Sequence, residues 1–409
     1  MNTYKNSKIR SIKAREILDS KGNPTVEVEL TTDLGKFLAS VPSGTSKGKF
    51  EAKTKDSKTA VKNIKGIIGP KLIGKSVVLQ KEIDDLLIKL DGTKDKSRLG
   101  ANAILAVSVA ALRAGAKTQK LSLWKWISKI SGQKSKLPYP SVLQIEGGLH
   151  GKGGLAVQEF MTVFPKGSFK KSFSQGIKIY YTLKNFLIEN YGPSAITLGL
   201  EGAFTPPIKE TKEALDTIME AANQAGFENK IKIILDAAAS SFFKKNRYCF
   251  EKKNLNKEEL LNFYFKILKN YPIIGIEDPF SEEDWQGWKM LMSNVKRQMS
   301  NLLVIGDDLT VTNPKRIKEA CKRGACNTLI IKPNQIGTVS ETITAAYLAK
   351  SYGWKVMVSH RSGETNDDFI SDLSVGIGAD FIKAGAPARG ERVVKYNRLL
   401  RIEEELKKR

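Results

Sequence analysis

Residues 273–277 read Ile273-Ile274-Gly275-Ile276-Glu277, a short apolar run that ends in a carboxylate. The same pattern, an apolar or β-branched run followed by one ionisable side chain, occurs six times between residues 233 and 383. Short continuous apolar runs separated by helical stretches indicate parallel strands that are buried on both faces. The six runs are 233–235, 273–276, 302–305, 328–331, 356–359 and 381–382.

The residues that follow these runs share one property, which is that each can carry charge. Successive members lie 23 to 41 residues apart, a spacing that fits one β/α unit each. In a closed β/α barrel the carboxyl ends of the strands meet on one face, and the active site lies there. We therefore predict an α/β protein with a β/α barrel, and we expect these side chains to meet at its face: Asp236, Glu277, Asp307, Lys332, His360 and Lys383.

The first third of the chain has another pattern, which predicts a smaller α+β domain. Polar and apolar side chains alternate along residues 25–31, and residues 36–41 follow after a Leu-Gly turn. We therefore expect an antiparallel hairpin. Residues 82–90 and 99–116 are expected to form helices, and the second is rich in alanine and should pack closely.

A loop of small residues at 40–51 is expected to be mobile, and a plain surface connection is the alternative. The stretch 117–140 contains a glycine and two prolines and is the best candidate for a domain boundary. We accordingly predict an N-terminal α+β domain at residues 1–136, which carries the loop, and a catalytic barrel at 137–409.

Composition excludes several classes of protein. With 41% hydrophobic and 27% charged residues among 409, the chain is not disordered. The longest nearly apolar run, 103–112, is too short to span a bilayer, and no signal peptide is read at the N-terminus. The three cysteines form no metal-type pair, which favours a reducing cytoplasm.

The net charge of +24 is unusual, and most of it lies near the N-terminus. Residues 1–136 hold 28 Lys and Arg against 12 Asp and Glu, whereas the remainder holds 39 against 31. The lysines are dispersed and lack interleaved aromatic residues, which favours a solvated basic surface over a nucleic-acid groove. Such a field would still attract an anionic substrate.

The predicted carboxylates at the barrel face suit a divalent metal. Asp236, Glu277 and Asp307 are hard oxygen ligands on adjacent strands, so we expect Mg²⁺ or Mn²⁺ rather than zinc; neutralisation by the two lysines is the alternative. A lysine near such a metal is a plausible general base for removing a proton from carbon next to a carboxylate. The barrel alone leaves racemisation, cycloisomerisation and elimination open. For elimination, Glu159 and Glu201 are candidate acids outside the strand series.

Several long motifs resemble those of the enolase (phosphopyruvate hydratase) family over essentially the whole chain. They lie in order along the sequence, at residues 14–28, 41–46, 276–280, 306–313, 334–337, 359–365 and 385–389. The resemblance implies a modified barrel of the type ββαα(βα)6 and at least a homodimer. It implies the reversible dehydration of 2-phosphoglycerate to phosphoenolpyruvate in glycolysis and gluconeogenesis, with two Mg²⁺ ions that stabilise the enolate.

The same resemblance implies roles for individual residues. Lys332 matches the base and Glu201 the acid, with Glu159 in support. The first Mg²⁺ would be held by Asp236, Glu277 and Asp307, and the second by Ser46 when the loop closes. Arg361 and Ser362 match the phosphate-binding pair. The remaining implied contacts to substrate or catalytic groups are Lys383 at the substrate carboxylate, Gln158, His150 and His360, the last two being the only histidines in the chain.

Some positions depart from the family pattern. Glu146 stands where Asn is typical and Leu200 where Asp is typical, and Ala203, Pro333, Lys47 and Gly390 also differ. No predicted catalytic group is lost, but polar contacts behind Glu201 change, which could alter its pKa. Two alternatives therefore stay open, namely a related enzyme with another phosphorylated substrate, and a basic RNA-binding or surface-binding protein on the same scaffold.

Overall fold

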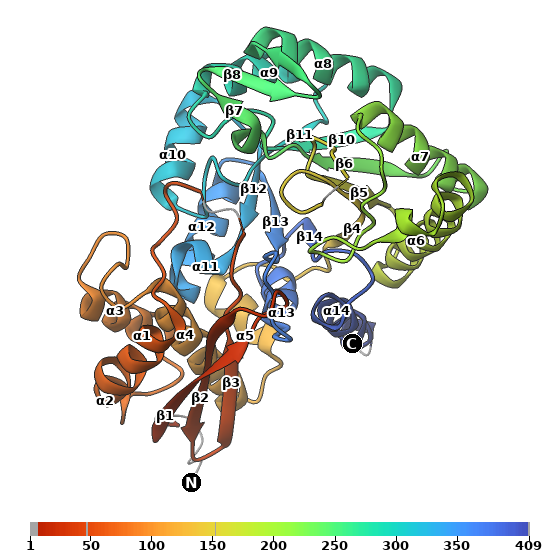
Figure 1. Ribbon diagram of the computed structural model, residues 1–409. Coiled ribbons are helices and arrows are strands. Elements are labelled where there is room, and N and C mark those ends of the chain that lie inside the picture. The colour runs from red at the N-terminus through yellow and green to blue at the C-terminus, as the bar shows by residue number, and fades with distance from the viewer. Residues whose placement is uncertain (1–6, 46–47, 152, 408–409) are drawn as a thin grey trace.

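The six predicted strands are present and belong to a closed barrel of eight strands (Figure 1). The computed structural model describes residues 7–45, 48–151 and 153–407. The barrel strands, in chain order, are β4 (Tyr139–Glu146), β5 (Glu159–Val163), β6 (Lys232–Asp236), β10 (Ile273–Glu277), β11 (Leu303–Gly306), β12 (Thr328–Ile331), β13 (Lys355–Ser359) and β14 (Phe381–Lys383).

One barrel strand runs against the others. β5 pairs antiparallel with both β4 and β6, whereas the remaining neighbours pair in parallel. Two helices follow β5, and each later strand is followed by a helix, so the predicted ββαα(βα)6 order is confirmed. The helices are α6 (Phe169–Tyr191), α7 (Thr211–Gln224), α8 (Lys257–Asn270), α9 (Trp285–Gln298), α10 (Pro314–Arg323), α11 (Pro333–Ile336), α12 (Val339–Ser351), α13 (Phe369–Gly376) and α14 (Gly390–Lys407).

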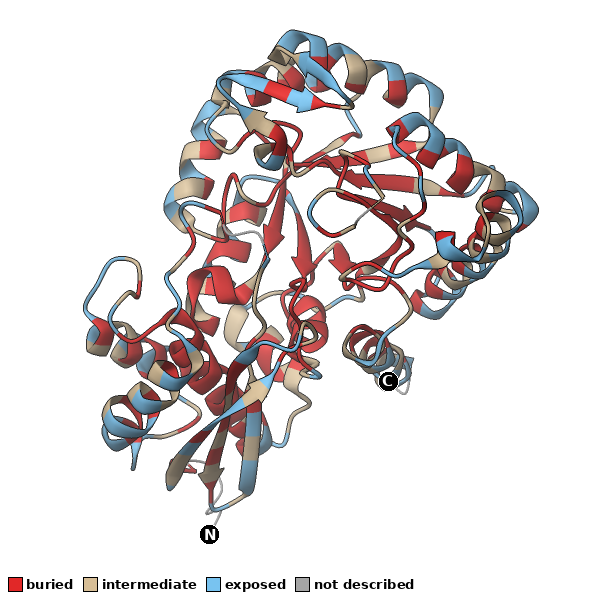
Figure 2. Cartoon of the chain, viewed as in Figure 1, coloured by how far each residue is buried: buried red, intermediate tan, exposed pale blue. Residues whose placement is uncertain are grey.

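Burial explains why the barrel runs are continuously apolar. The strands are buried along nearly their whole length, while most of the helices around them expose one face; α11 and α13 are buried throughout (Figure 2). Strands covered on both sides need apolar residues at every position, which is the pattern in the sequence. A short sheet of β7 (Phe243–Lys244), β8 (Arg247–Phe250) and β9 (Lys253–Leu255) lies between β6 and α8 and was not expected.

The smaller N-terminal domain is built on an antiparallel sheet, in the order β1-β2-β3. The predicted hairpin is β2 (Pro24–Thr32) with β3 (Gly35–Ser40), and β1 (Ser11–Leu18) pairs with β2. Both predicted helices are present as α3 (Gln80–Asp91) and α4 (Ala101–Thr118). α4 packs on β2 and β3 and is buried over most of its length, as its alanine content predicts. The remaining elements are α1 (Ser57–Asn63), a π-helical turn (Ile64–Ile68) and α2 (Gly69–Leu72).

The stretch 117–140, the candidate domain boundary, contains a packed helix. α5 (Leu123–Ser131) lies against α13 of the barrel so closely that a Cβ on Gly376 would come within 2.5 Å of Ile127 Cβ. Trp124 and Trp126 are buried here, which a Lys-rich, Gly-containing sequence did not suggest. The boundary at residue 136 stays a prediction. Among the described residues, no helix has both the length and the apolar character needed to cross a bilayer.

Candidate active site

The charged residues that follow the barrel strands gather at one end of the barrel. Eleven of the thirteen predicted site residues line a single pocket there, together with Thr45 from the loop of the N-terminal domain. Glu277 lies just behind the pocket wall and is fully buried. Ser46, the predicted loop ligand of a second metal, lies outside the described residues, as does Lys47. The roles of these residues stay predictions, but the topology does bring them together.

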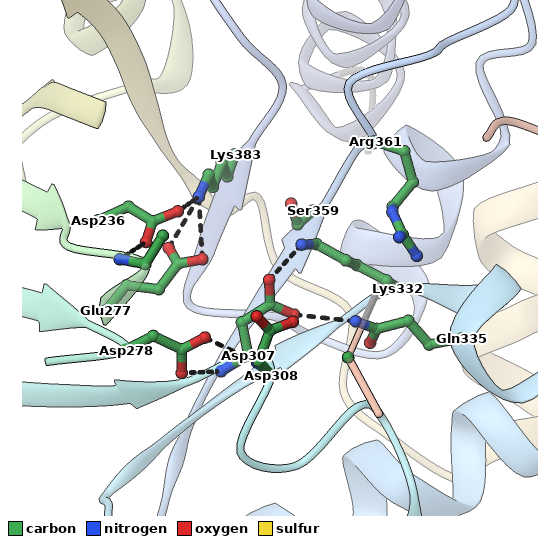
Figure 3. A network of polar contacts seen from close by, with 12 residues as sticks. Asp236, Glu277, Asp278, Asp307, Asp308, Lys332, Gln335, Ser359, Arg361 and Lys383 are labelled. Carbon is green, nitrogen blue, oxygen red and sulfur yellow. Dashed lines mark hydrogen bonds and ion pairs between the residues drawn. The ribbon is translucent and has the colours of Figure 1, made fainter. Parts of the chain in front are cut away.

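Lys383 lies among the carboxylates of neighbouring strands. Its Nζ donates to Asp236 Oδ2 and to both oxygens of Glu277 at 2.9 Å (Figure 3), and it lies 3.1 Å from Glu159 Oε2. Burial, together with the negative charge of Asp236, raises the pKa of Glu277 well above its usual range despite Lys383. One ammonium therefore serves three buried carboxylates, and this corner of the pocket can accept further positive charge.

Lys332 forms an ion pair with Asp307 on the adjacent strand end. Asp307 Oδ1 also accepts a hydrogen bond from Gln335 Nε2 at 3.0 Å. Burial by itself would lower the pKa of Lys332, but the charge of Asp307 outweighs it and the net shift is upward. Asp307 thus favours the ammonium form of Lys332, and the role of Lys332 as the base stays a prediction.

Two further carboxylates adjoin this pair and were not singled out from the sequence. Asp278 accepts hydrogen bonds from the backbone N–H groups of Asp307 (3.0 Å) and Asp308 (2.7 Å), as Figure 3 shows. Carboxylate oxygens of the three residues lie within 4.8 Å of one another. Burial, together with Asp307, raises the pKa of Asp308 to about 8. The signal was present, since each residue directly follows a predicted ligand, Glu277 or Asp307, in the chain.

The donor set fits a hard divalent cation. Asp236 and Glu277 end the adjacent strands β6 and β10, Asp307 directly follows β11, and all three carboxylates are at least nine-tenths buried. Oxygen ligands of this kind suit Mg²⁺ or Mn²⁺. Burial and the charge of Asp236 raise the pKa of Glu277, and a bound cation would oppose both effects.

The acid candidate Glu201 approaches the pocket from an irregular segment rather than from a strand end. Its Oε2 lies 2.8 Å from His360 Nε2, and its Oε1 lies 3.6 Å from His150 Nδ1. His150 Nδ1 is also 3.5 Å from Glu159 Oε1. Although burial opposes it, the positive character of the two histidines lowers the pKa of Glu201 well below its usual range, whereas burial and Glu201 raise the pKa of Glu159.

A buried arginine that sequence reasoning did not identify fixes the orientation of this group. Arg392, on α14, donates from Nη1 to His360 Nδ1 at 2.7 Å, so that nitrogen is an acceptor and the ring proton must lie on Nε2, facing Glu201. The same guanidinium donates to the carbonyls of Arg361 and Ser362, each at 2.6 Å, and to that of Leu200 at 3.2 Å. It thereby links the two segments that carry the acid and the predicted phosphate pair.

The predicted phosphate-binding residues meet the N-terminal domain. The Arg361 guanidinium donates to the two carboxylate oxygens of Glu51 at 3.1 and 3.2 Å. Ser362 Oγ accepts from Thr45 N–H at 2.9 Å and lies 2.7 Å from Thr45 Oγ1. A planar fork of this kind binds carboxylate and phosphate alike, so Glu51 occupies a geometry that suits an oxyanion.

The chain matches two family models in succession. The model described as "Enolase, N-terminal domain" matches residues 9–127, and the one described as "Enolase, C-terminal TIM barrel domain" matches residues 134–409. The chain is also 46% identical, over 411 aligned positions, to the protein named "Enolase" of Methanocaldococcus jannaschii, and the match covers 97% of this chain and 95% of that protein. Together with the barrel, these matches show that the chain belongs to the enolase family.

Proposed function

We propose that the chain catalyses the reaction of its family, the reversible dehydration of 2-phosphoglycerate to phosphoenolpyruvate and water, as a hydro-lyase. The observation that supports this most strongly is the composition of one pocket. A lysine base candidate, a glutamate acid candidate, an Arg–Ser pair and a cluster of carboxylates line the same pocket. These are the groups that elimination from a phosphorylated hydroxy acid requires.

In this proposal the substrate phosphate is bound by Arg361 and Ser362, whose side chains now contact Glu51 and Thr45. Glu51 must therefore lose at least one of its hydrogen bonds with Arg361 when a phosphate binds. Lys383 neutralises the substrate carboxylate, and for this its ammonium exchanges contacts with Asp236 and Glu277 for contacts with substrate. Both adjustments trade one carboxylate partner for another anion, so the substrate adds negative charge that bound divalent ions would offset.

Lys332 Nζ then accepts the proton from carbon 2. Glu201, whose pKa is lowered in the free pocket, takes up the proton of the adjacent His150, whose Nδ1 lies 3.6 Å from Glu201 Oε1, and donates it to the departing hydroxyl of carbon 3. Divalent ions bound at Asp236, Glu277 and Asp307 would supply positive charge to the substrate carboxylate and compensate Asp307, so that Lys332 can lose its proton. Lys332 follows β12, whereas Glu201 lies in the segment that packs on the end of β4, so base and acid come from different arcs of the barrel. Elimination needs this separation, because the proton and the hydroxyl leave from different atoms.

The finer properties belong to the same proposal. We propose two Mg²⁺ ions per site, the second completed by Ser46, with Mn²⁺ as a substitute. We propose a homodimer that acts in glycolysis and gluconeogenesis in the cytoplasm, where free cysteines such as Cys249, Cys321 and Cys326 persist. Binding of RNA through the basic N-terminal domain stays a prediction.

The test is a direct ultraviolet assay of the purified protein with 2-phosphoglycerate, first with Mg²⁺ and then with EDTA. Rapid formation of the enol product that EDTA abolishes is the expected result. A well-folded protein without turnover would contradict the proposed substrate, and the same assay with other phosphorylated hydroxy acids would then test the alternative enzyme.

A further inference from the structure

The acid candidate Glu201 belongs to a short irregular segment, residues 199–204, which lies against the end of β4. The segment is bound to the strand through its backbone, since Glu146 N–H donates to Phe204 O at 2.9 Å and Phe204 N–H donates to Gln144 O at 3.2 Å. Neither contact involves the residues on either side of the Glu201 carboxylate. Backbone contacts hold the carbonyl of Glu201, which accepts from Ala386 N–H at 3.1 Å, and the N–H of Leu200, which donates to His150 O at 3.2 Å, but they leave the N–H groups of Glu201 and Ala203 to another acceptor.

The side chain of Glu146 supplies that contact. Its Oε1 accepts from Ala203 N–H at 2.7 Å, and both of its oxygens lie 3.0 Å from Glu201 N. Glu146 is fully buried, and its carboxylate lies so close to the segment that a Cβ on Gly199 would approach Oε2 to 2.6 Å. The carboxylate thus lies inside the turn and accepts hydrogen bonds from two backbone N–H groups, that of Glu201 itself and that of Ala203.

We propose that Glu146 is a positioning residue, which holds the backbone on both sides of Glu201 and so directs the acid at the leaving hydroxyl. This inference rests on the proposed function. A carboxylate suits the place better than an amide, because both of its oxygens face an N–H group: Oε1 faces those of Glu201 and Ala203, and Oε2 faces that of Glu201. A glutamine would face one of the two N–H groups with its own NH₂, whichever way it were turned.

The surroundings of Glu146 contain few charges to compete for it. The ionisable groups that face it from the packed elements are Glu201 on the segment itself, His150 on the loop after β4, Glu159 on β5 and Tyr180 on α6, whose hydroxyl donates to Gly202 O at 2.8 Å. Burial, together with the charge of Glu201, raises the pKa of Glu146 to about 8, whereas the two N–H groups favour its ionised form. The variants below are therefore compared with wild type at about pH 9, where Glu146 is a carboxylate. The contact geometry, and not this titration, carries the proposal.

Two substitutions separate the contact from the charge. Glu146→Gln keeps the reach of the side chain but removes its charge and one acceptor, whereas Glu146→Asp keeps the charge and withdraws both oxygens by one methylene. Asp84→Asn is the matched control, since Asp84 is another buried carboxylate that accepts a backbone hydrogen bond, from Ser340 N–H at 2.8 Å, but does not line the pocket.

Two activities are measured in parallel for each variant, namely overall dehydration and exchange of the carbon-2 hydrogen with deuterium in D₂O. We expect both Glu146 variants to lose about 10- to 100-fold in dehydration, with little change in KM and with exchange retained, because only the acid is misplaced. Asp84→Asn should change neither dehydration nor exchange. Equal loss of dehydration and exchange would mean that Glu146 merely supports the pocket as a whole and would overturn the proposal.

A second readout does not depend on turnover. The only two histidines of the chain, His150 and His360, both lie beside the Glu201 carboxylate, so their ring NMR signals report its position and charge. Glu146→Gln should lower the pKa of His150, because Glu146 is one of the carboxylates that raise it, and should shift the His360 signals. Unchanged histidine signals in that variant would refute the positioning role. An inactive wild type with these shifts would refute the proposed function and leave the positioning role standing.

Discussion

The two sides of the pocket are built in different ways. The base side, with Lys332, Asp307 and Gln335, stands on strand ends and a short helix, and its side chains contact one another directly. The acid side, with Glu201, stands on an irregular segment that the contacts of Glu146 and Arg392 hold in place. A catalytic side chain on a strand end is placed by the barrel itself. One on an irregular segment needs residues whose task is to hold the backbone.

The largest effect should come from removing the reactive groups themselves, and the two sides should fail differently. Lys332→Ala should abolish both dehydration and carbon-2 hydrogen exchange, whereas Glu201→Gln should lose about 10²- to 10⁴-fold in dehydration while exchange continues. Proton removal from carbon 2 involves the base alone, which is the reason for the difference.

Parallel assays of turnover and of deuterium incorporation by NMR check this prediction. Lys318→Ala, a change of an exposed lysine on α10, is the control and should behave as wild type. If Lys332→Ala still exchanged the carbon-2 hydrogen, another group would have to be the base.

This division also decides how much the sequence could predict. The barrel, its order and the meeting of the strand-end residues follow from a repeated pattern, because parallel topology places strand ends together. The partners of Glu201 could not be found in this way. Arg392 lies more than 30 residues beyond His360, on a helix whose sequence looks like an ordinary charged helix. Its burial is known only once α14 is docked.

Local composition does not show two further features, for related reasons. The stretch 117–140, predicted as a domain boundary from its glycine and prolines, also contains α5, where Trp124 and Trp126 are buried. The ion pair of Lys332 with Asp307, which raises the pKa of Lys332, is likewise fixed only by the folded barrel. In both cases the decisive contact is tertiary.

The next effect in size tests the arginine that links the two segments. Arg392→Lys should reduce kcat by about 10- to 100-fold, since a single ammonium cannot contact His360 Nδ1 and three carbonyls together. The tautomer of His360 should also become mixed, and ¹⁵N chemical shifts of the ring measure this directly. Arg398→Lys on the same helix, where the partners are Asp372 and Glu405, should leave the His360 signals unchanged.

A smaller effect is expected at the predicted phosphate pair, where the two domains meet. Arg361→Lys should raise KM about tenfold and lower kcat less, because an ammonium cannot present two parallel N–H groups to a phosphate. Steady-state kinetics, together with competition by inorganic phosphate, measures the change. An unchanged inhibition constant for phosphate in this variant would place the phosphate elsewhere in the pocket.

The last effect concerns stability rather than rate and returns to the acid side. The pKa of Glu146 is raised to about 8 in the folded protein by burial and by Glu201, from its ordinary value of 4.5. Between these two values the unfolded chain releases a proton that the folded chain retains, so rising pH favours unfolding, by up to about 1.4 kcal/mol per pH unit. Below pH 4.5 both states hold the proton, and above pH 8 both have lost it.

Glu146→Gln removes this dependence on pH. The Tm of the variant should therefore fall less than that of wild type from pH 5 to pH 8, whatever constant difference in Tm the lost contacts produce. Glu258→Gln, a change of an exposed carboxylate on α8, should follow the wild-type curve, and parallel curves for all three proteins would show that Glu146 is already ionised at pH 5.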